Sequence, residues 1–216
     1  MKSRNTSFDV FKGFACIGIV LMHSKFPEPA GTGFRSLACF GVPLFFSISG
    51  YYLSSKELID PSNIIRKIHH ILIMIAGSEI FYSVFSFLLN GLYDPVRRAS
   101  FIETSFKKGW FEKYIVLNQP PVYAHLWFLY ALLTLYLLVL LFARSRKSIL
   151  RVAIPSVPVL LICIVLLQEL KDSGIIRNGF HLISSETELY KSSFFLFRAA
   201  PFFLLGFLFY EYRERV

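Results

Sequence analysis

Charged residues are scarce in this chain. Asp, Glu, Lys and Arg make up 17% of its 216 residues, whereas 55% of the residues are apolar. A soluble globular domain would carry nearer to ~25% charged residues, and the mean hydropathy of this chain is +0.55. This composition argues against a water-soluble globule. It predicts an all-α fold, a polytopic bundle of membrane-spanning helices.

Cysteine is also rare, with three residues in the whole chain. Cys16, Cys39 and Cys163 all lie in apolar runs. Such positions argue against disulfide staples and against a metal site, and we expect small packing residues there. The sequence therefore predicts no bound metal.

Acidic residues number 14 against 23 basic ones, which gives a formal net charge of +9. No basic stripe with interleaved aromatic residues is present, so a nucleic-acid partner is not expected. The first apolar run lacks a small-x-small cleavage site before Pro27, which argues against a cleaved signal peptide. No internal repeat of useful length is visible. We expect residues 1–216 to form one membrane domain.

Six apolar runs are long enough to cross a membrane, since about 17–25 helical residues suffice. We expect residues 91–124, between the third and fourth runs, to include an interfacial segment with Trp110. The six runs cover residues 8–26, 37–54, 68–90, 125–143, 152–170 and 194–210.

Basic residues cluster at four places between or beside these runs. By the positive-inside rule all four places belong on the cytoplasmic side, so both termini are predicted to be cytoplasmic. The clusters are Lys2, Arg4 and Lys12; Lys56, Arg66 and Lys67; Arg144, Arg146, Lys147 and Arg151; and Arg213 and Arg215. The segments 27–36, 91–124 and 171–193 are then predicted to be outer loops.

The first run, residues 8–26, carries three ionisable side chains. At about 100° per residue, Asp9, Lys12 and His23 fall on one stripe of the helix. Asp9 and Lys12 are three residues apart and are predicted to form an ion pair. His23 lies about 16 Å from Lys12 along the axis, roughly half of a ~30 Å hydrocarbon core. Ionisable groups inside a membrane are functional candidates.

Small residues mark the second run, in the sequence GVPLFFSISGYYL at positions 41–53. They form either a tight packing face or, through Ser49, part of a substrate-binding site. The next run opens with the basic group Arg66, Lys67 and His69. This group either anchors the helix to anionic headgroups or binds a phosphorylated cofactor.

Other ionisable groups lie within or beside the later runs. His125 and Trp127 stand at the same predicted depth as His23, either as interfacial residues or as parts of one outer cavity. Glu79 is either neutral and hydrogen-bonded near Tyr82 and Ser83 or functional. Arg198 faces the bundle interior or extends toward the interface.

The motifs taken together resemble the acyltransferase 3 family, membrane O-acyltransferases that acetylate bacterial surface polysaccharides. Lys12-x10-His23 resembles its Arg-x10-His, and HLWFLYALLTLYLL at 125–138 its His-Leu-Trp-Phe-Leu segment. The sequence at 41–53 resembles the family's double-phenylalanine, serine-glycine signature. The segment IIRKIHHIL stands where the family has a basic cluster. The segment from Arg198 to Tyr210 is similar to a later family helix. The resemblance covers essentially this whole chain but only part of the family domain, which normally has more helices.

The resemblance implies acetyl-CoA as acyl donor and a polysaccharide or a lipid-linked sugar as acceptor, in a bacterial inner membrane. It implies catalytic roles for His23, Asp9 and Lys12. The donor would bind Lys12, Arg66, Lys67 and His69, and the acceptor would bind His125, Trp127, Ser49, Glu79 and Arg198. Lys12 replaces the family's arginine, and His69 and His70 stand where further arginines are usual. The number of chains in the assembly stays open.

Two other interpretations fit the same sequence. The chain is either an active enzyme or a truncated, inactive acyltransferase remnant, since it stops after the sixth run. A small transporter would also carry ionisable residues inside the membrane. Such a transporter would be expected to show paired interrupted helices in two halves, and the sequence does not show them.

Overall fold

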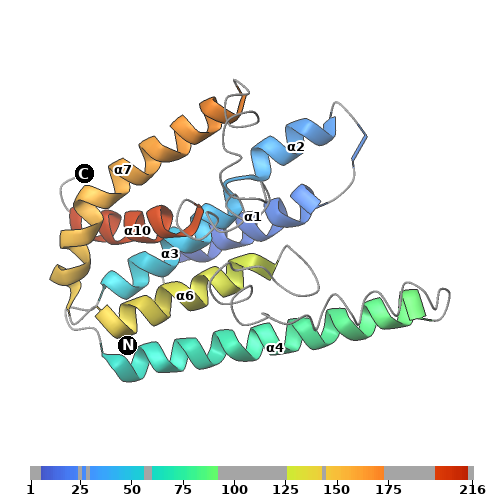
Figure 1. The fold of residues 1–216 in the computed structure, drawn as a ribbon, viewed down its shortest axis with the longest axis horizontal. Helices are drawn as coiled ribbons and strands as arrows, with labels where there is room; N and C mark the ends of the chain where they lie inside the picture. The colour runs from blue at the N-terminus through green and yellow to red at the C-terminus, as the bar shows by residue number, and fades with distance from the viewer. Residues whose placement is uncertain are drawn as a thin grey trace, which may run out of the picture. The chain divides into compact units, whose positions relative to one another are not determined.

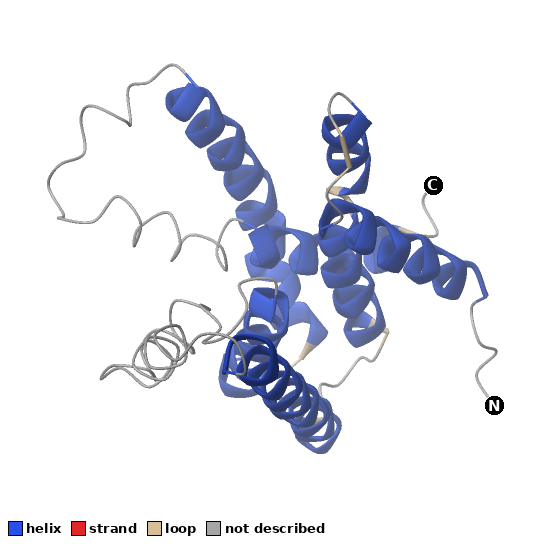
Figure 2. Ribbon diagram, turned by 90° about the vertical axis from the view of Figure 1, so that its right-hand side faces the viewer, coloured by secondary structure: helices blue, strands red, loops and turns tan. Residues whose placement is uncertain are grey.

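The computed structural model describes residues 6–23, 26–27, 30–55, 60–91, 126–142, 145–172 and 198–213. Within these residues every regular element is a helix and none is a strand (Figure 2), which confirms the all-α prediction. The helices are α1 (Thr6–His23), α2 (Ala30–Ala38), α3 (Gly41–Ser54), α4 (Pro61–Gly91), α6 (Trp127–Phe142), α7 (Arg146–Asp172) and α10 (Ala200–Tyr212).

Two of the described helices are long and apolar enough to cross a membrane. They contain the stretches Pro61–Leu88 in α4 and Arg146–Leu166 in α7, while α6 and α10 are apolar but shorter. Large apolar side chains on the outer faces of both helices are exposed, among them Ile80 and Val165, as expected of helices that face lipid. The six predicted spans as a set stay a prediction.

The chain divides into two compact units. Unit 1 contains α1, α2, α3, α10 and the first part of α7, up to Leu161. Unit 2 contains α4, α6 and the remainder of α7. The charged stripe of α1 therefore belongs to unit 1, and the basic group at the start of α4 belongs to unit 2.

The helices α3 and α10 run side by side in unit 1 (Figure 1). A Cβ atom on Gly50 would lie 1.9 Å from the carbonyl oxygen of Phe203, and one on Gly206 would lie 2.0 Å from that of Ser47. The Ser47 hydroxyl donates a hydrogen bond to the Phe202 carbonyl at 3.0 Å. Small residues thus let the two backbones touch, as in membrane helix pairs. The predicted packing face at 41–53 is confirmed.

Four helix ends meet at one end of unit 1. The ring of Phe8 in α1 lies 4.8 Å from the Tyr51 ring in α3, which lies 5.2 Å from the Tyr210 ring in α10. Arg146, the first residue of α7, approaches Glu211 of α10 at 3.5 Å. These are the ends that the distribution of basic residues assigns to one side of the membrane. Their observed grouping agrees with the predicted relative directions of the helices.

Several helix boundaries differ from the predictions. The second run begins as α3 at Gly41 instead of residue 37, and α4 begins at Pro61 instead of residue 68. The segment 27–36 is predicted to be a loop, yet it contains most of α2. At the start of this helix, the Gly31 amide donates a backbone hydrogen bond to the Pro27 carbonyl. The first turn of α7 starts at Arg146 instead of residue 152, preceded by a Ser145 hydroxyl that accepts from the Ser148 amide at 3.4 Å.

The helices α4 and α6 form the core of unit 2 and run antiparallel. Lys67 near the start of α4 pairs with Tyr136, and Glu79 further along pairs with Tyr130, earlier in α6. An apolar cluster of Leu126, Leu129 and Tyr130 packs between them, against Ile75, Tyr82 and Phe128.

We predict that Gly206→Ala destabilises the protein, because the added methyl group would collide with the backbone of α3. Overpacking of this kind costs roughly 1–3 kcal/mol, so the melting temperature of the purified protein in lipid nanodiscs should fall by several degrees. Gly13→Ala in α1 is the matched control, since no atom lies within 4 Å of its added Cβ. Equal melting temperatures for the two variants would contradict this packing.

Candidate functional site

The charged stripe of α1 is partly assembled in the structure. Lys12 Nζ lies 3.9 Å from Asp9 Oδ1, which confirms the predicted ion pair. The same ammonium group lies 5.1 Å from the centre of the Tyr52 ring. Lys12 is therefore held by a carboxylate and an aromatic face together, and both charged side chains keep about a third of their surface exposed.

His23 is the last residue of α1, and the helix is continuous from Asp9 to His23. Helical geometry therefore keeps the three positions on one stripe, with His23 about three turns beyond Lys12. A catalytic role for His23 is a prediction that the geometry of the described side chains does not test.

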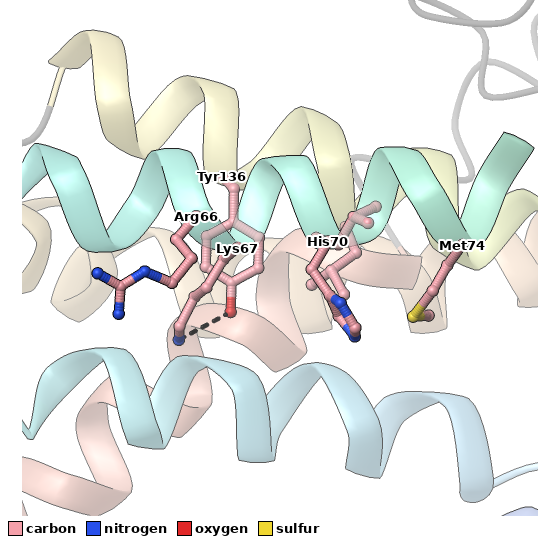
Figure 3. A pocket seen from close by; sticks show the side chains of 7 residues that line it. Arg66, Lys67, His70, Met74 and Tyr136 are labelled. Carbon is pink, nitrogen blue, oxygen red and sulfur yellow. Dashed lines mark hydrogen bonds between the residues drawn. The ribbon is translucent and has the colours of Figure 1, made fainter.

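The second site is an open groove in unit 2, between α4 and α6 (Figure 3). Its volume is about 460 Å³. Cationic and imidazole groups stand toward the start of α4, and apolar groups continue along the helix. The lining residues are Arg66, Lys67, His70, Ile71, Met74, Leu132 and Tyr136.

Lys67 is fixed in this groove by Tyr136. Its Nζ atom donates a hydrogen bond to the Tyr136 hydroxyl at 3.3 Å and lies 5.1 Å from the centre of that ring. In Figure 3, Arg66 and His70 project to the same side of α4 as Lys67. Guanidinium and ammonium groups in this arrangement bind phosphate oxygens through charge-assisted hydrogen bonds. The groove can therefore hold an anionic group next to an apolar chain.

His70, and not His69, lies at this groove. His69 is exposed and is not among the lining residues. At about 100° per residue, His70 stands about 40° from Arg66, whereas His69 stands about 130° from the middle of the groove face. Counting helical positions along IIRKIHHIL would have identified His70 from the sequence.

Glu79 has a partner that the sequence did not indicate. The Tyr130 hydroxyl of α6 donates a hydrogen bond to Glu79 Oε1 at 2.9 Å, whereas we expected Tyr82 or Ser83 of the same helix. The second oxygen, Oε2, is buried and has no hydrogen-bond partner among the described residues. The pairing depends on how α4 and α6 align, which local spacing does not reveal.

Of the remaining predicted residues, Ser49 lies in α3, Arg198 just before α10 and Trp127 in α6. The Ser49 hydroxyl donates to the Phe45 carbonyl within its own helix at 2.8 Å, and Arg198 is exposed just before α10. Trp127 is half-buried in the first turn of α6, and His125 lies outside the described residues together with the predicted interfacial segment. Among the residues that the structure describes, no cluster of His, Cys, Asp or Glu could hold a metal ion.

The family model described as an acyltransferase domain matches residues 5–216. The chain belongs to the acyltransferase 3 family. Comparison with curated proteins finds no significant match, and comparison with solved structures likewise finds none. An acyltransferase needs places for an acyl donor and an acceptor. Among the described residues, the groove of unit 2 and the charged stripe of α1 both carry ionisable groups.

We predict that the groove binds pyrophosphate through Arg66 and Lys67. Substituting either residue by Ala should weaken binding by about tenfold, because hydrogen bonds to charged groups contribute roughly 1.5–3 kcal/mol each. His70→Ala should weaken it less, and His69→Ala should leave it unchanged. Isothermal titration of the purified protein in nanodiscs measures these affinities. Equal losses for His69→Ala and Arg66→Ala would show that the groove does not hold the anion.

Proposed function

We propose that this acyltransferase moves an acetyl or related acyl group from acyl-CoA to a hydroxyl group of a surface polysaccharide or of its lipid-linked precursor. The observation that carries the proposal is the groove between α4 and α6 in a chain of this family. One end of the groove is cationic and the other is apolar, which suits a donor that joins phosphates to a long, less polar arm.

The donor's phosphates are assigned to Arg66 and Lys67, with His70 in place of the expected His69. Tyr136 keeps the Lys67 ammonium in position before the donor arrives, so less side-chain freedom is lost on binding. The arm of the donor would lie along Ile71, Met74 and Leu132. We propose acetyl-CoA as the co-substrate on this basis.

The acyl transfer itself requires a base for the acceptor hydroxyl. That oxygen attacks the thioester carbonyl carbon, the carbon–sulfur bond breaks, and the thiolate leaves. A histidine suits both proton steps, because an ordinary imidazole, with a pKa near 6.5, is largely neutral at pH 7. We assign this role to His23, which takes the hydroxyl proton and returns it to the sulfur.

Asp9 and Lys12 lie on the same face of α1 as His23, and we assign them a supporting electrostatic role. Their ion pair reduces the free-energy cost of placing either charge in an apolar surrounding. Lys12 stays partly exposed above the Tyr52 ring, so its ammonium group remains open to an anionic partner. We also propose the acceptor contacts that the sequence predicts. They are Trp127, Ser49, Arg198 and His125.

The proposed setting is a bacterial inner membrane crossed six times, with both termini in the cytoplasm. The grouping of four helix ends in unit 1 supports it, because those ends carry Lys12, Arg146 and Arg213. Basic residues favour the cytoplasmic side of a membrane. A cytoplasmic location of the basic ends also puts them where acyl-CoA is made.

We predict that His23→Ala abolishes acetylation. The chain and its variants would be expressed in a bacterial strain that lacks its own enzyme, and acetyl esters on the surface polysaccharide would be counted by mass spectrometry. Loss of a general base lowers the rate by about 10²–10⁴-fold, so the esters should fall to background. His69→Ala is the matched histidine control and should keep them.

Two results would contradict parts of this proposal. Full acetylation by His23→Ala at normal protein levels would remove His23 from the chemistry. Absence of esters from the unchanged chain, despite good expression, would favour the inactive remnant.

A further inference from the structure

Two arginine side chains meet at one tyrosine ring, where the start of α7 reaches the end of α10 (Figure 1). The guanidinium carbon of Arg213 lies 3.8 Å from the centre of the Tyr210 ring, and that of Arg146 lies 5.8 Å from it. All three residues belong to unit 1. Two positive charges that are far apart in the sequence are therefore held against a single aromatic ring.

The ion pair at this ring is loose. Glu211 Oε2 lies 3.5 Å from Arg146 Nε, yet this Nε atom makes no hydrogen bond among the described residues. An ion pair without a hydrogen bond gives way readily to a better acceptor. Phosphate oxygens are such acceptors, because a guanidinium group binds them with two parallel hydrogen bonds.

The arginine pair is accessible from outside the protein. Arg213 is exposed, and the side chain of Arg146 keeps 23% of its surface exposed. Stacking on a ring uses the flat face of a guanidinium group, whereas its N–H donors lie along the edge. The Tyr210 ring thus orients the two groups and leaves their edges for an anion.

The surroundings favour a lipid over a soluble phosphate. Arg146 is the first residue of the stretch Arg146–Leu166, which is apolar enough to cross a membrane. Large apolar side chains follow on both helices within two turns of the arginine pair. Val152 on α7 is 56% exposed, and Phe209 on α10 is 58% exposed. Cations at the edge of a lipid-facing apolar surface meet anionic headgroups.

We propose that Arg213 and Arg146 form a binding site for the phosphate-bearing headgroup of an anionic phospholipid, with Tyr210 as the platform that orients both guanidinium groups. The acyl chains of this lipid lie against the exposed apolar side chains of α7 and α10. The bound lipid joins the start of one helix to the end of the other. This site is independent of acyl transfer and of the groove in unit 2.

Native mass spectrometry of the purified full chain, released from detergent micelles, measures this binding directly. The protein would be titrated with phosphatidylglycerol, which is anionic, and with phosphatidylcholine, which is zwitterionic. We expect phosphatidylglycerol to bind saturably and at least about tenfold more tightly, because each basic residue at a membrane surface adds to the attraction for anionic lipid. Inorganic phosphate, added as a competitor, distinguishes a lipid site from a site for free phosphate.

Two variants of Arg213 test the site itself. Arg213→Gln removes an exposed cation and should weaken phosphatidylglycerol binding about tenfold, as loss of a hydrogen bond to a charged group does. Arg213→Lys keeps the charge but loses the planar fork, so it should also weaken binding. Lys147→Gln is the matched control, since Lys147 is exposed and stands about 100° around α7 from Arg146. It should bind as the parent does.

Glu211→Gln separates a binding role from a structural one. It removes a carboxylate that competes for Arg146 and repels phosphate, so phosphatidylglycerol should bind more tightly than to the parent. If the arginines served only to hold α7 against α10, the same change would lower the melting temperature and bring no gain in lipid affinity.

Four results would overturn the proposal. The first is phosphatidylglycerol that binds no more tightly than phosphatidylcholine. The second is an equal loss for Lys147→Gln and Arg213→Gln, which is the behaviour of a diffuse positive surface. The third is weaker lipid binding by Glu211→Gln. The fourth is displacement of the lipid by an equal concentration of inorganic phosphate, which would make free phosphate the ligand.

Discussion

The rest of unit 1 depends on the contact between the backbones of α3 and α10. Gly50 and Gly206 remove the side chains that would separate these helices, and the Ser47 hydroxyl donates to the Phe202 carbonyl across the gap. With their backbones in contact, the two helices hold a fixed alignment along each other. That alignment brings the rings of Tyr51 and Tyr210 together, and Phe8 of α1 packs against the same end. Lys12 is thereby held over the neighbouring Tyr52 ring.

In unit 2 the corresponding constraint is polar. Two ionisable side chains of α4, Lys67 and Glu79, each use a tyrosine of α6 as partner. The pairs occur in opposite order along the two helices, so they fix an antiparallel alignment and give each ionisable side chain a hydrogen-bond partner. In an apolar surrounding such hydrogen bonds are hard to exchange for water. The cationic groove lies beside Lys67, whereas the second carboxyl oxygen of Glu79 is buried and has no partner among the described residues.

Residues within one helix were predictable from the sequence, and contacts between helices were not. The Asp9–Lys12 pair and the small packing face of α3 follow from spacing alone, and both are present. The sequence analysis placed His69 in the basic group, whereas helical phase places His70 at the groove. The partner of Glu79 depended on the alignment of α4 with α6. The helix α2 was missed because the two prolines just before it and the two glycines within it favoured a loop.

The chain belongs to the acyltransferase 3 family, whose members transfer acyl groups. We interpret the groove of unit 2 and the charged stripe of α1 in terms of this reaction. The central claim is that the chain itself carries out this transfer from acyl-CoA. Its most direct test reconstitutes the purified chain in lipid vesicles with acetyl-CoA that carries a radiolabelled acetyl group, and adds a surface polysaccharide extract. The account predicts label in the polysaccharide that mild alkali releases as acetate. Label that stays on acetyl-CoA, with folded protein present, would contradict it.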